Sequence, residues 1–485
     1  MMTGKGRPKM RGSSIQPSEA TEVLKLKREI GLTSAVSLIA GTMIGSGIFM
    51  SPEGVLRNIG SPGGSLIIWT ACGLLATFGA LSYAELGTLI KESGGEYIYI
   101  LRNFGSFPAF LYIFTSVIVV RPASVAAISL SFAEYAVAPF YPGCSSSPLA
   151  VKCTAIACIL LLALVNCLSV KLATSIMNIF TAAKLLALLI IIVGGIQLLI
   201  QGHTQSFQNA FQGTKTGAGV IGIAFYQGLW SFDGWSNLNS VTEEVKKPEV
   251  NLPRAMMIAI PLVTFFYVLV NVSYFAAMSP VELLSSSGVA ITWGDKVLGS
   301  WAWLMSLSAA LSSFGSANGT FFSGGRVCYI AAREGHMPGI LSMAHVRRVT
   351  PSPALIFTSI VSFIIVIPGN FSQLVNLFSF TAWFFYGITV TGLLYLKIKK
   401  PEMPRSYKVP IIIPVIFLLS SAYLVLAPII DQPQMEFLYV ILFILSGAIF
   451  YFPLVRYKYH PACLQRLTLH LQLLLDVVPT EKNMD

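Results

Sequence analysis

Long apolar stretches recur along almost the whole chain and constrain its fold more than any other feature. Only 11% of the residues are charged and 54% are hydrophobic, whereas soluble domains carry about 25% charged residues. A helix that spans a bilayer needs about 20 largely apolar residues. The sequence therefore predicts an all-α membrane protein with twelve transmembrane helices. We expect them near residues 31–58, 63–90, 106–139, 150–170, 175–201, 217–240, 252–278, 298–332, 352–369, 374–398, 408–430 and 434–456.

The positions of the basic residues predict the orientation. Most of the 32 Lys and Arg residues fall before residue 31, in alternate loops or in the tail, and cytoplasmic loops are enriched in such residues. We therefore expect a multi-pass protein with both termini in the cytoplasm. The same bias explains the net charge of +11, so we do not interpret that charge as nucleic-acid binding. Residues 1–30 lack the apolar core of a cleavable signal peptide and are expected to be disordered.

Two of the predicted spans are interrupted. Gly45-Ser-Gly-Ile-Phe49 breaks the first, and Trp230-Ser-Phe-Asp-Gly-Trp235 breaks the sixth and contains a carboxylate, Asp233. Matched breaks in two halves indicate the binding site of a transporter built from inverted repeats. We expect a 5+5 inverted repeat of the LeuT-like kind, with one repeat at 31–201 and the other at 217–398. Spans eleven and twelve (408–457) and a cytoplasmic tail (458–485) follow, in which leucines indicate an amphipathic helix on the membrane surface or packed on cytoplasmic loops.

The breaks suggest how a ligand is held. Gly45 and Gly47 allow a close backbone approach and a positive φ. The half-helix that begins near Ile48 offers N–H groups to a carboxylate. The half-helices that end near Ile44 and Trp230 offer carbonyls to an ammonium group. Together they match the backbone of an amino acid, although one break taken alone would favour a packing kink.

Asp233 is an ionisable residue at membrane depth, which marks a functional site by default. Beside the amino-acid backbone site, it is placed to receive a cationic side chain, such as that of lysine or arginine. The alternatives are a structural ion pair or a helix cap. Trp230 and Trp235 are candidates to close over the substrate, and core packing is the alternative for both.

Five motifs make a family resemblance specific. They are Gly41-Thr-Met-Ile-Gly-Ser-Gly-Ile-Phe49, Ser93-Gly-Gly-Glu-Tyr97, Phe180-Thr-Ala-Ala-Lys184, Val241-Thr-Glu-Glu-Val245 and Arg333-Glu-Gly-His-Met337. The chain resembles, from Leu32 to Pro479, the light subunits of heteromeric amino-acid transporters in the amino acid–polyamine–organocation superfamily. Within that family it is most similar to the exchangers of neutral and cationic amino acids that pair with the heavy chain rBAT.

The resemblance implies sodium-independent obligatory exchange by alternating access, with no enzymatic activity and no cofactor. It implies a substrate site made by Met43, Ile44, Gly45, Ser46, Gly47, Trp230, Ser231 and Asp233. Lys184 matches a lysine whose ammonium group stands where sodium-coupled relatives bind an ion. A lysine that reaches toward the membrane interface is the alternative.

Cys144 matches the cysteine that links such light chains to their single-span glycoprotein heavy chain. It lies in a turn-rich segment predicted to be outside the cell, where disulfides persist. The other six cysteines have no metal-like spacing, and we expect them to pack in apolar surroundings. The implied location is the plasma membrane, and pairing with rBAT is compatible with the apical face of an epithelium.

Some positions depart from the pattern of the most similar family members. Ser231-Phe232 replaces Ala-Tyr, and Arg121 replaces Lys. Ala382 stands where the cystine/glutamate exchanger has an arginine, which argues against an anionic substrate. These changes leave open an exchanger that prefers aromatic or large neutral amino acids. Arg121 and Tyr386 are further candidates to line the pocket, with helix packing the alternative for Tyr386.

Other function classes fit the sequence less well. A channel needs a continuous polar pathway, with charged rings or a carbonyl filter, and the chain shows only isolated ionisable residues in its spans. An intramembrane metalloprotease needs a histidine pair such as H-E-x-x-H, which is absent. A serine hydrolase needs a histidine partner for its serine, and no predicted span supplies one. We therefore expect neither a metal site nor a catalytic site.

Overall fold

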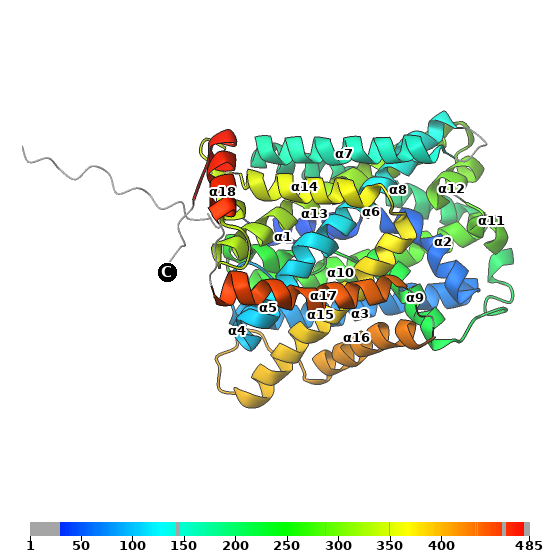
Figure 1. Cartoon of the computed structure of the whole chain (residues 1–485). Coiled ribbons are helices and arrows are strands. Elements are labelled where there is room, and N and C mark those ends of the chain that lie inside the picture. Colours follow the sequence, from blue (N-terminus) through cyan, green and yellow to red (C-terminus); the bar gives the residue numbers. More distant parts are fainter. Residues whose placement is uncertain are drawn as a thin grey trace, which may run out of the picture.

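The computed structural model describes residues 30–141, 146–286, 288–348, 350–431, 433, 435–457 and 462–479. Helices dominate this part of the chain (Figure 1). The α-helices are α1 (Leu32–Met43), α2 (Gly47–Ile59), α3 (Pro62–Leu89), α4 (Glu96–Phe104), α5 (Ser106–Thr115), α6 (Arg121–Val137), α7 (Pro148–Leu168), α8 (Val170–Ile200), α9 (Ala218–Trp230), α10 (Pro248–Ala277), α11 (Pro280–Leu284), α12 (Val289–Val297), α13 (Trp303–Arg333), α14 (Ser352–Val366), α15 (Phe371–Lys399), α16 (Ile412–Asp431), α17 (Met435–Phe450) and α18 (Ala462–Leu474).

Shorter elements join these helices. The π-helical segments η1 (Ser116–Val120) and η7 (Tyr451–Arg456) continue α5 into α6 and extend α17. The 3-10 turns are η2 (Ala138–Phe140), η3 (Gln205–Phe207), η4 (Asn237–Glu244), η5 (Gly299–Trp301) and η6 (Gly339–Ser342), and the strands are β1 (Met343–His345) and β2 (Val477–Pro479). The fold is thus a multi-pass helical membrane protein.

Fewer helices meet the length and composition expected of a membrane span than the sequence predicts. Among the described residues, eight segments are long and apolar enough, and the bent pair α1 and α2 makes up to nine. Helices α9 and α14 have only 13 and 15 residues. Helix α13 has 31 residues, but serines and glycines recur along it and lower its apolar character. The count of twelve stays a prediction.

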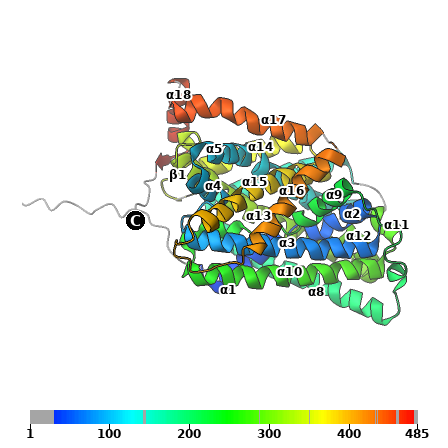
Figure 2. The same ribbon diagram turned by 90° about the horizontal axis from the view of Figure 1, so that it is seen from below.

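The long helices run alongside one another as a bundle (Figures 1 and 2). Helices α4 and α18 lie at one end of the bundle, and α11 and α12 lie at the opposite end. The most apolar part of Ser106–Phe140 is 78% buried, whereas that of Met435–Arg456 is 17% buried. The segment from α5 to α6 is therefore a core element, and α17 lies on the outside of the bundle (Figure 2), with Leu438, Leu442 and Leu445 exposed.

The C-terminal tail packs partly on a loop. Strand β2 pairs antiparallel with β1, with Ala344 opposite Val478. Leu471 and Leu475 pack against the main hydrophobic core, while Leu473 and Leu474 are exposed. The predicted tail helix is therefore confirmed as α18, and the chain beyond it contacts the loop between α13 and α14. The exposed leucines still present an apolar face.

Among the cysteines whose side chains the structure describes, all but one agree with the packing prediction. Cys72, Cys158 and Cys328 are buried, and Cys167 is partly buried. Cys153 is exposed on the outer face of α7, so the prediction of buried packing is wrong there. Cys144 lies outside the described residues.

Candidate functional site

The first predicted break is confirmed. Helix α1 ends at Met43, α2 begins at Gly47, and the two axes differ by 47°. A Cβ atom on Gly45 would lie 2.5 Å from the Ser316 hydroxyl, and one on Gly47 would collide with Ser231. Neither glycine has a positive φ. Close packing, and not the left-handed conformation that we expected as well, is therefore what requires glycine at these two positions.

The second break lies beside the first. Helix α9 ends at Trp230, and a run of turns leads into the 3-10 segment η4. Gly234 has a φ of 100°, a backbone conformation that residues other than glycine rarely adopt. A Cβ atom there would also lie 2.8 Å from the Thr42 hydroxyl. The turn from Asp233 to Trp235 therefore requires glycine at position 234.

Neighbouring helices satisfy the carbonyl groups that the breaks release. The Tyr267 hydroxyl of α10 lies 2.7 Å from the Met43 carbonyl and 2.9 Å from the Ser231 carbonyl. A tyrosine hydroxyl carries one hydrogen, so it donates to one of the two breaks at a time. From α13, Ser316 donates to the Thr42 carbonyl at 3.2 Å and Ser312 to the Gly45 carbonyl at 3.3 Å. The carbonyls expected to bind an ammonium group are thus already partly hydrogen-bonded.

Lys184 supports the same segment from the opposite side. Its ammonium group donates to the Gly41 carbonyl at 2.7 Å, and the side chain is 1% exposed. It also lies against Gly315, where a Cβ atom would come within 3.3 Å of the ammonium nitrogen. The lysine therefore joins α8 to α1 and α13 inside the bundle. It does not reach toward the membrane interface.

Two cavities meet at Asp233. The first, the break cavity, has a volume of about 10 Å³ and is lined by Thr42, Met43, Gly45, Ser46, Gly47, Ile128, Trp230, Asp233 and Ser316. The second, the charged cavity, has a volume of about 30 Å³ and is lined by Glu96, Tyr112, Ser116, Val120, Arg121, Asp233, Ser236, Asn237, Phe378, Ala382, Phe385 and Tyr386. Asp233 is the residue common to both linings, so its carboxylate connects a backbone-lined space with one that contains ionisable groups.

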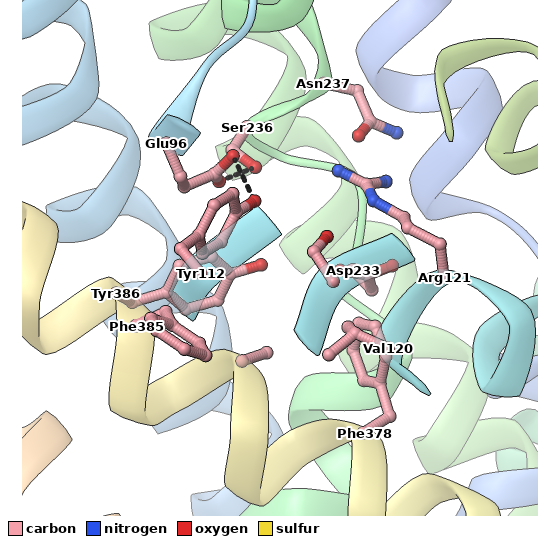
Figure 3. A pocket seen from close by; sticks show the side chains of 12 residues that line it. Glu96, Tyr112, Val120, Arg121, Asp233, Ser236, Asn237, Phe378, Phe385 and Tyr386 are labelled. Atoms are coloured by element: carbon pink, nitrogen blue, oxygen red, sulfur yellow. Dashed lines mark hydrogen bonds between the residues drawn. The ribbon is translucent and has the colours of Figure 1, made fainter. Parts of the chain in front are cut away.

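Figure 3 shows the charged cavity from close by. Arg121, on α6, enters from one side, and Glu96 and Tyr112 lie on the other. Arg121 attracts the carboxylates of both Glu96 and Asp233. The Glu96 carboxylate accepts hydrogen bonds from Ser236 at 2.9 Å and from Tyr112 at 3.4 Å. Two carboxylates and one guanidinium group therefore share a space walled by aromatic side chains.

The two tryptophans of the second break differ in their surroundings. Trp230 packs edge-on against Phe371 and Phe378, with ring centroids 6.1 and 5.1 Å apart, and lines the break cavity. Trp235 is 3% exposed and packs between Tyr83, Tyr386 and Phe417. Trp230 is thus placed at the site, and Trp235 is a core residue.

A larger space lies beyond Trp230, at the end of the bundle with α11 and α12. This outer cavity has a volume of about 300 Å³ and includes Met50, Glu53, Gln227 and Phe371 in its lining. Gln227 donates to the Asn376 side chain at 3.0 Å. Trp230 lines the break cavity and Phe371 the outer one, so the contact of their rings lies between the two cavities.

The structure brings together most of the predicted site residues. Met43, Gly45, Ser46, Gly47, Trp230 and Asp233 line the break cavity, and Arg121 and Tyr386 line the charged cavity. Ile44 and Ser231 are buried but line neither cavity, and the Ser231 side chain faces Gly47. Sequence reasoning missed Glu96 and Tyr267. Glu96 belongs to a motif that we used only for the family resemblance.

Comparisons with known proteins show the family of the chain. The profile of the family described as amino acid permease matches residues 30–450. The chain belongs to the amino acid permease family. This permease is 52% identical over 472 residues to the human b(0,+)-type amino acid transporter 1, with 97% of each chain covered.

Two further relatives name other substrates. The permease is 42% identical over 480 residues to the human cystine/glutamate transporter, covering 98% of this chain and 95% of that one. It is 43% identical over 493 residues to the mouse large neutral amino acids transporter small subunit 2, covering 99% and 92%. In the described ranges of the permease, no group of three or more His, Cys, Asp and Glu side chains is placed to hold a metal ion.

Proposed function

We propose that this permease exchanges cationic and neutral amino acids by sodium-independent obligatory antiport. The observation that carries the proposal is the position of Asp233 at the junction of the break cavity and the charged cavity. Peptide groups at the breaks bind the substrate's carboxylate and ammonium groups. The Asp233 carboxylate then meets the side chain, and a positive charge there compensates the cost of a carboxylate at membrane depth.

Lys184 supports the sodium-independent part of the proposal. A fixed ammonium group between α8, α1 and α13 supplies the positive charge that a bound sodium ion would otherwise supply. Alternating access then depends on the substrate alone. Opening toward α11 and α12 requires Trp230 to leave Phe371 and Gln227 to release Asn376.

The finer architecture is part of the proposal. We infer twelve spans in a 5+5 inverted repeat, with α1 and α2 as the broken first span and α9 and η4 as the broken sixth. The contact of Gly47 with Ser231 and the shared Tyr267 support equivalent roles for the two breaks. We place the permease in the plasma membrane with both termini in the cytoplasm, so that α4 and α18 lie on the cytoplasmic side.

The experiment that tests the proposal replaces Asp233 by Asn. Cells that express the permease with its heavy chain take up labelled arginine or leucine in exchange for internal amino acid. Loss of the charge removes a charge-assisted interaction of about 1.5–3 kcal/mol, so arginine exchange falls about tenfold or more. Leucine exchange stays within about twofold of the wild type. An equal fall for both substrates would show that Asp233 supports the fold and does not bind the side chain.

A second candidate function is exchange of aromatic or large neutral amino acids. The aromatic lining of the charged cavity favours it, since Tyr112, Phe378, Phe385 and Tyr386 surround the space next to Asp233. Uptake of tyrosine and cystine in the same assay distinguishes the two functions. Wild-type permease that takes up tyrosine and leucine but not arginine fits the second function and contradicts the first.

The partner is the last part of the proposal. We infer a single-span glycoprotein heavy chain, rBAT or a protein like it, joined through Cys144. Cys144→Ser abolishes the covalent heterodimer on a non-reducing gel and leaves the reduced bands unchanged. Cys153→Ser is the matched control, because Cys153 is exposed and is not expected to form the link. A covalent heterodimer that persists in Cys144→Ser would assign the link to another thiol.

A further inference from the structure

The inference concerns Glu96, a carboxylate that the proposed mechanism does not use. Glu96 is 3% exposed and lines the charged cavity. It is the first residue of α4, where the positive end of the helix favours a carboxylate. That position accounts for an acidic residue in the first turn. It does not account for a carboxylate that also lines the cavity beside Asp233.

Two residues from other elements hold the Glu96 carboxylate in place. Ser236, which follows the second break, donates at 2.9 Å, and Tyr112 of α5 donates at 3.4 Å. Figure 3 shows the three groups together on the wall opposite Arg121. Because Ser236 is three residues from Asp233, a movement of the second break changes the surroundings of the Glu96 carboxylate and of the Asp233 carboxylate at the same time.

The formal charges of the cavity favour a cationic guest. Its lining has two carboxylates, Glu96 and Asp233, against one guanidinium group, Arg121. Charges at membrane depth are costly unless they are compensated. One positive charge on a substrate side chain brings the sum of the formal charges in the cavity to zero. A short neutral side chain that stays in the break cavity leaves the charges around Glu96 unchanged.

We propose that Glu96 is a second specificity carboxylate, which receives the cationic end of the substrate after Asp233 and on the α4 side of the pocket. In this sequence of contacts Arg121 pairs with Asp233 once the substrate's charge has moved to Glu96. The direction follows from the arrangement, since Glu96 lies on α4, at the end of the bundle opposite the outer cavity. This inference rests on the proposed exchange of cationic amino acids.

The test compares Glu96→Gln with two variants that keep the charge. Glutamine preserves the shape and one of the two oxygens that accept from Ser236 and Tyr112, and it removes the negative charge. Ser236→Ala and Tyr112→Phe each remove one hydrogen bond to Glu96 and leave its carboxylate. All are expressed with the heavy chain, and exchange of labelled arginine and leucine is measured with leucine inside the cells.

The expected result is that arginine exchange and leucine exchange are affected differently. Glu96→Gln lowers arginine exchange about tenfold and leaves leucine exchange within about twofold, while the two control variants keep the wild-type ratio of arginine to leucine. An equal fall for both substrates, an unchanged ratio, or the same selective loss in a control variant would each overturn the role of the Glu96 charge. Wild-type permease that fails to exchange arginine would instead refute the proposed function, and this inference with it.

Discussion

At the scale of single residues, the site is a small set of charges held among peptide groups. Asp233 lines both cavities, Arg121 faces it across the charged cavity, and Lys184 is set apart beneath the first break. The three have different partners. Lys184 is bonded to a backbone carbonyl, while Arg121 and Asp233 attract one another across the charged cavity. We therefore expect support of the break and recognition of a substrate side chain to be separate tasks.

This separation makes Lys184 testable. Lys184→Met keeps the length of the side chain but leaves the Gly41 carbonyl without its donor, at a cost of about 1–3 kcal/mol. Because the lysine supports the break and lines neither cavity, exchange of arginine and of leucine falls alike, by about tenfold. Initial rates of exchange for both substrates, corrected for surface expression, measure it.

Lys152→Met is the matched control. Lys152 also donates to a backbone carbonyl, that of Ile367, but on the outside of α7. This variant exchanges both substrates at the wild-type rate. Selective loss of arginine exchange in Lys184→Met would contradict the supporting role, and so would an unchanged rate.

Sequence reasoning identified some of these residues and missed others for a physical reason. Asp233 stands out because a carboxylate inside an apolar run is rare. Glu96 lies between two spans, where acidic residues are common, so only the fold reveals that α4 turns it into the cavity. Tyr267 looks like an ordinary apolar residue of its helix until its hydroxyl is placed between Met43 and Ser231.

At the scale of elements, the two broken helices depend on close contact with each other. Gly47 of α2 lies against Ser231, just beyond α9, and the Tyr267 hydroxyl of α10 reaches both breaks. The single hydroxyl hydrogen of Tyr267 is donated to either the Met43 or the Ser231 carbonyl, so the position of one break depends on that of the other. We expect the two breaks to move together during exchange.

Gly47→Ala tests this contact. The added methyl group collides with Ser231, and overpacking of this kind costs about 1–3 kcal/mol. The variant therefore has a lower Tm in detergent and reduced exchange of every substrate. Gly339→Ala is the control, because a Cβ atom on Gly339 meets nothing within 4 Å. Wild-type Tm and exchange in Gly47→Ala would show that the two segments are not packed as described.

The sequence predicts helix positions better than helix boundaries and shapes. The long helix from Ser106 to Phe140 and the break after Met43 match expectation because hydrophobic runs and paired glycines have direct structural causes. Helix α9 ends at Trp230, where the second break is predicted, but the turns and the 3-10 segment that follow are not evident from the apolar run through residue 240. The positive φ at Gly234 and its absence at Gly45 and Gly47 depend on packing between distant segments.

At the scale of the whole molecule, the charged cavity lies between two ends of the helix bundle that differ from each other. Toward α11 and α12 lies the outer cavity of about 300 Å³, whose lining includes Gln227, bonded to Asn376, and Phe371, packed on Trp230. Toward α4 the charged cavity stops at Glu96, Tyr112 and Ser236. The cavities next to Asp233 are much smaller than the outer one, so a substrate is admitted only when elements around the breaks move.

The central claim is obligatory, sodium-independent exchange of cationic and neutral amino acids, and counter-flow in liposomes tests it most directly. The permease with its heavy chain is reconstituted with or without internal leucine, and uptake of labelled arginine is followed with sodium and with a sodium substitute. The account predicts uptake that requires internal leucine and is the same with either cation. Uptake into liposomes without internal amino acid, or uptake that requires sodium, would contradict it.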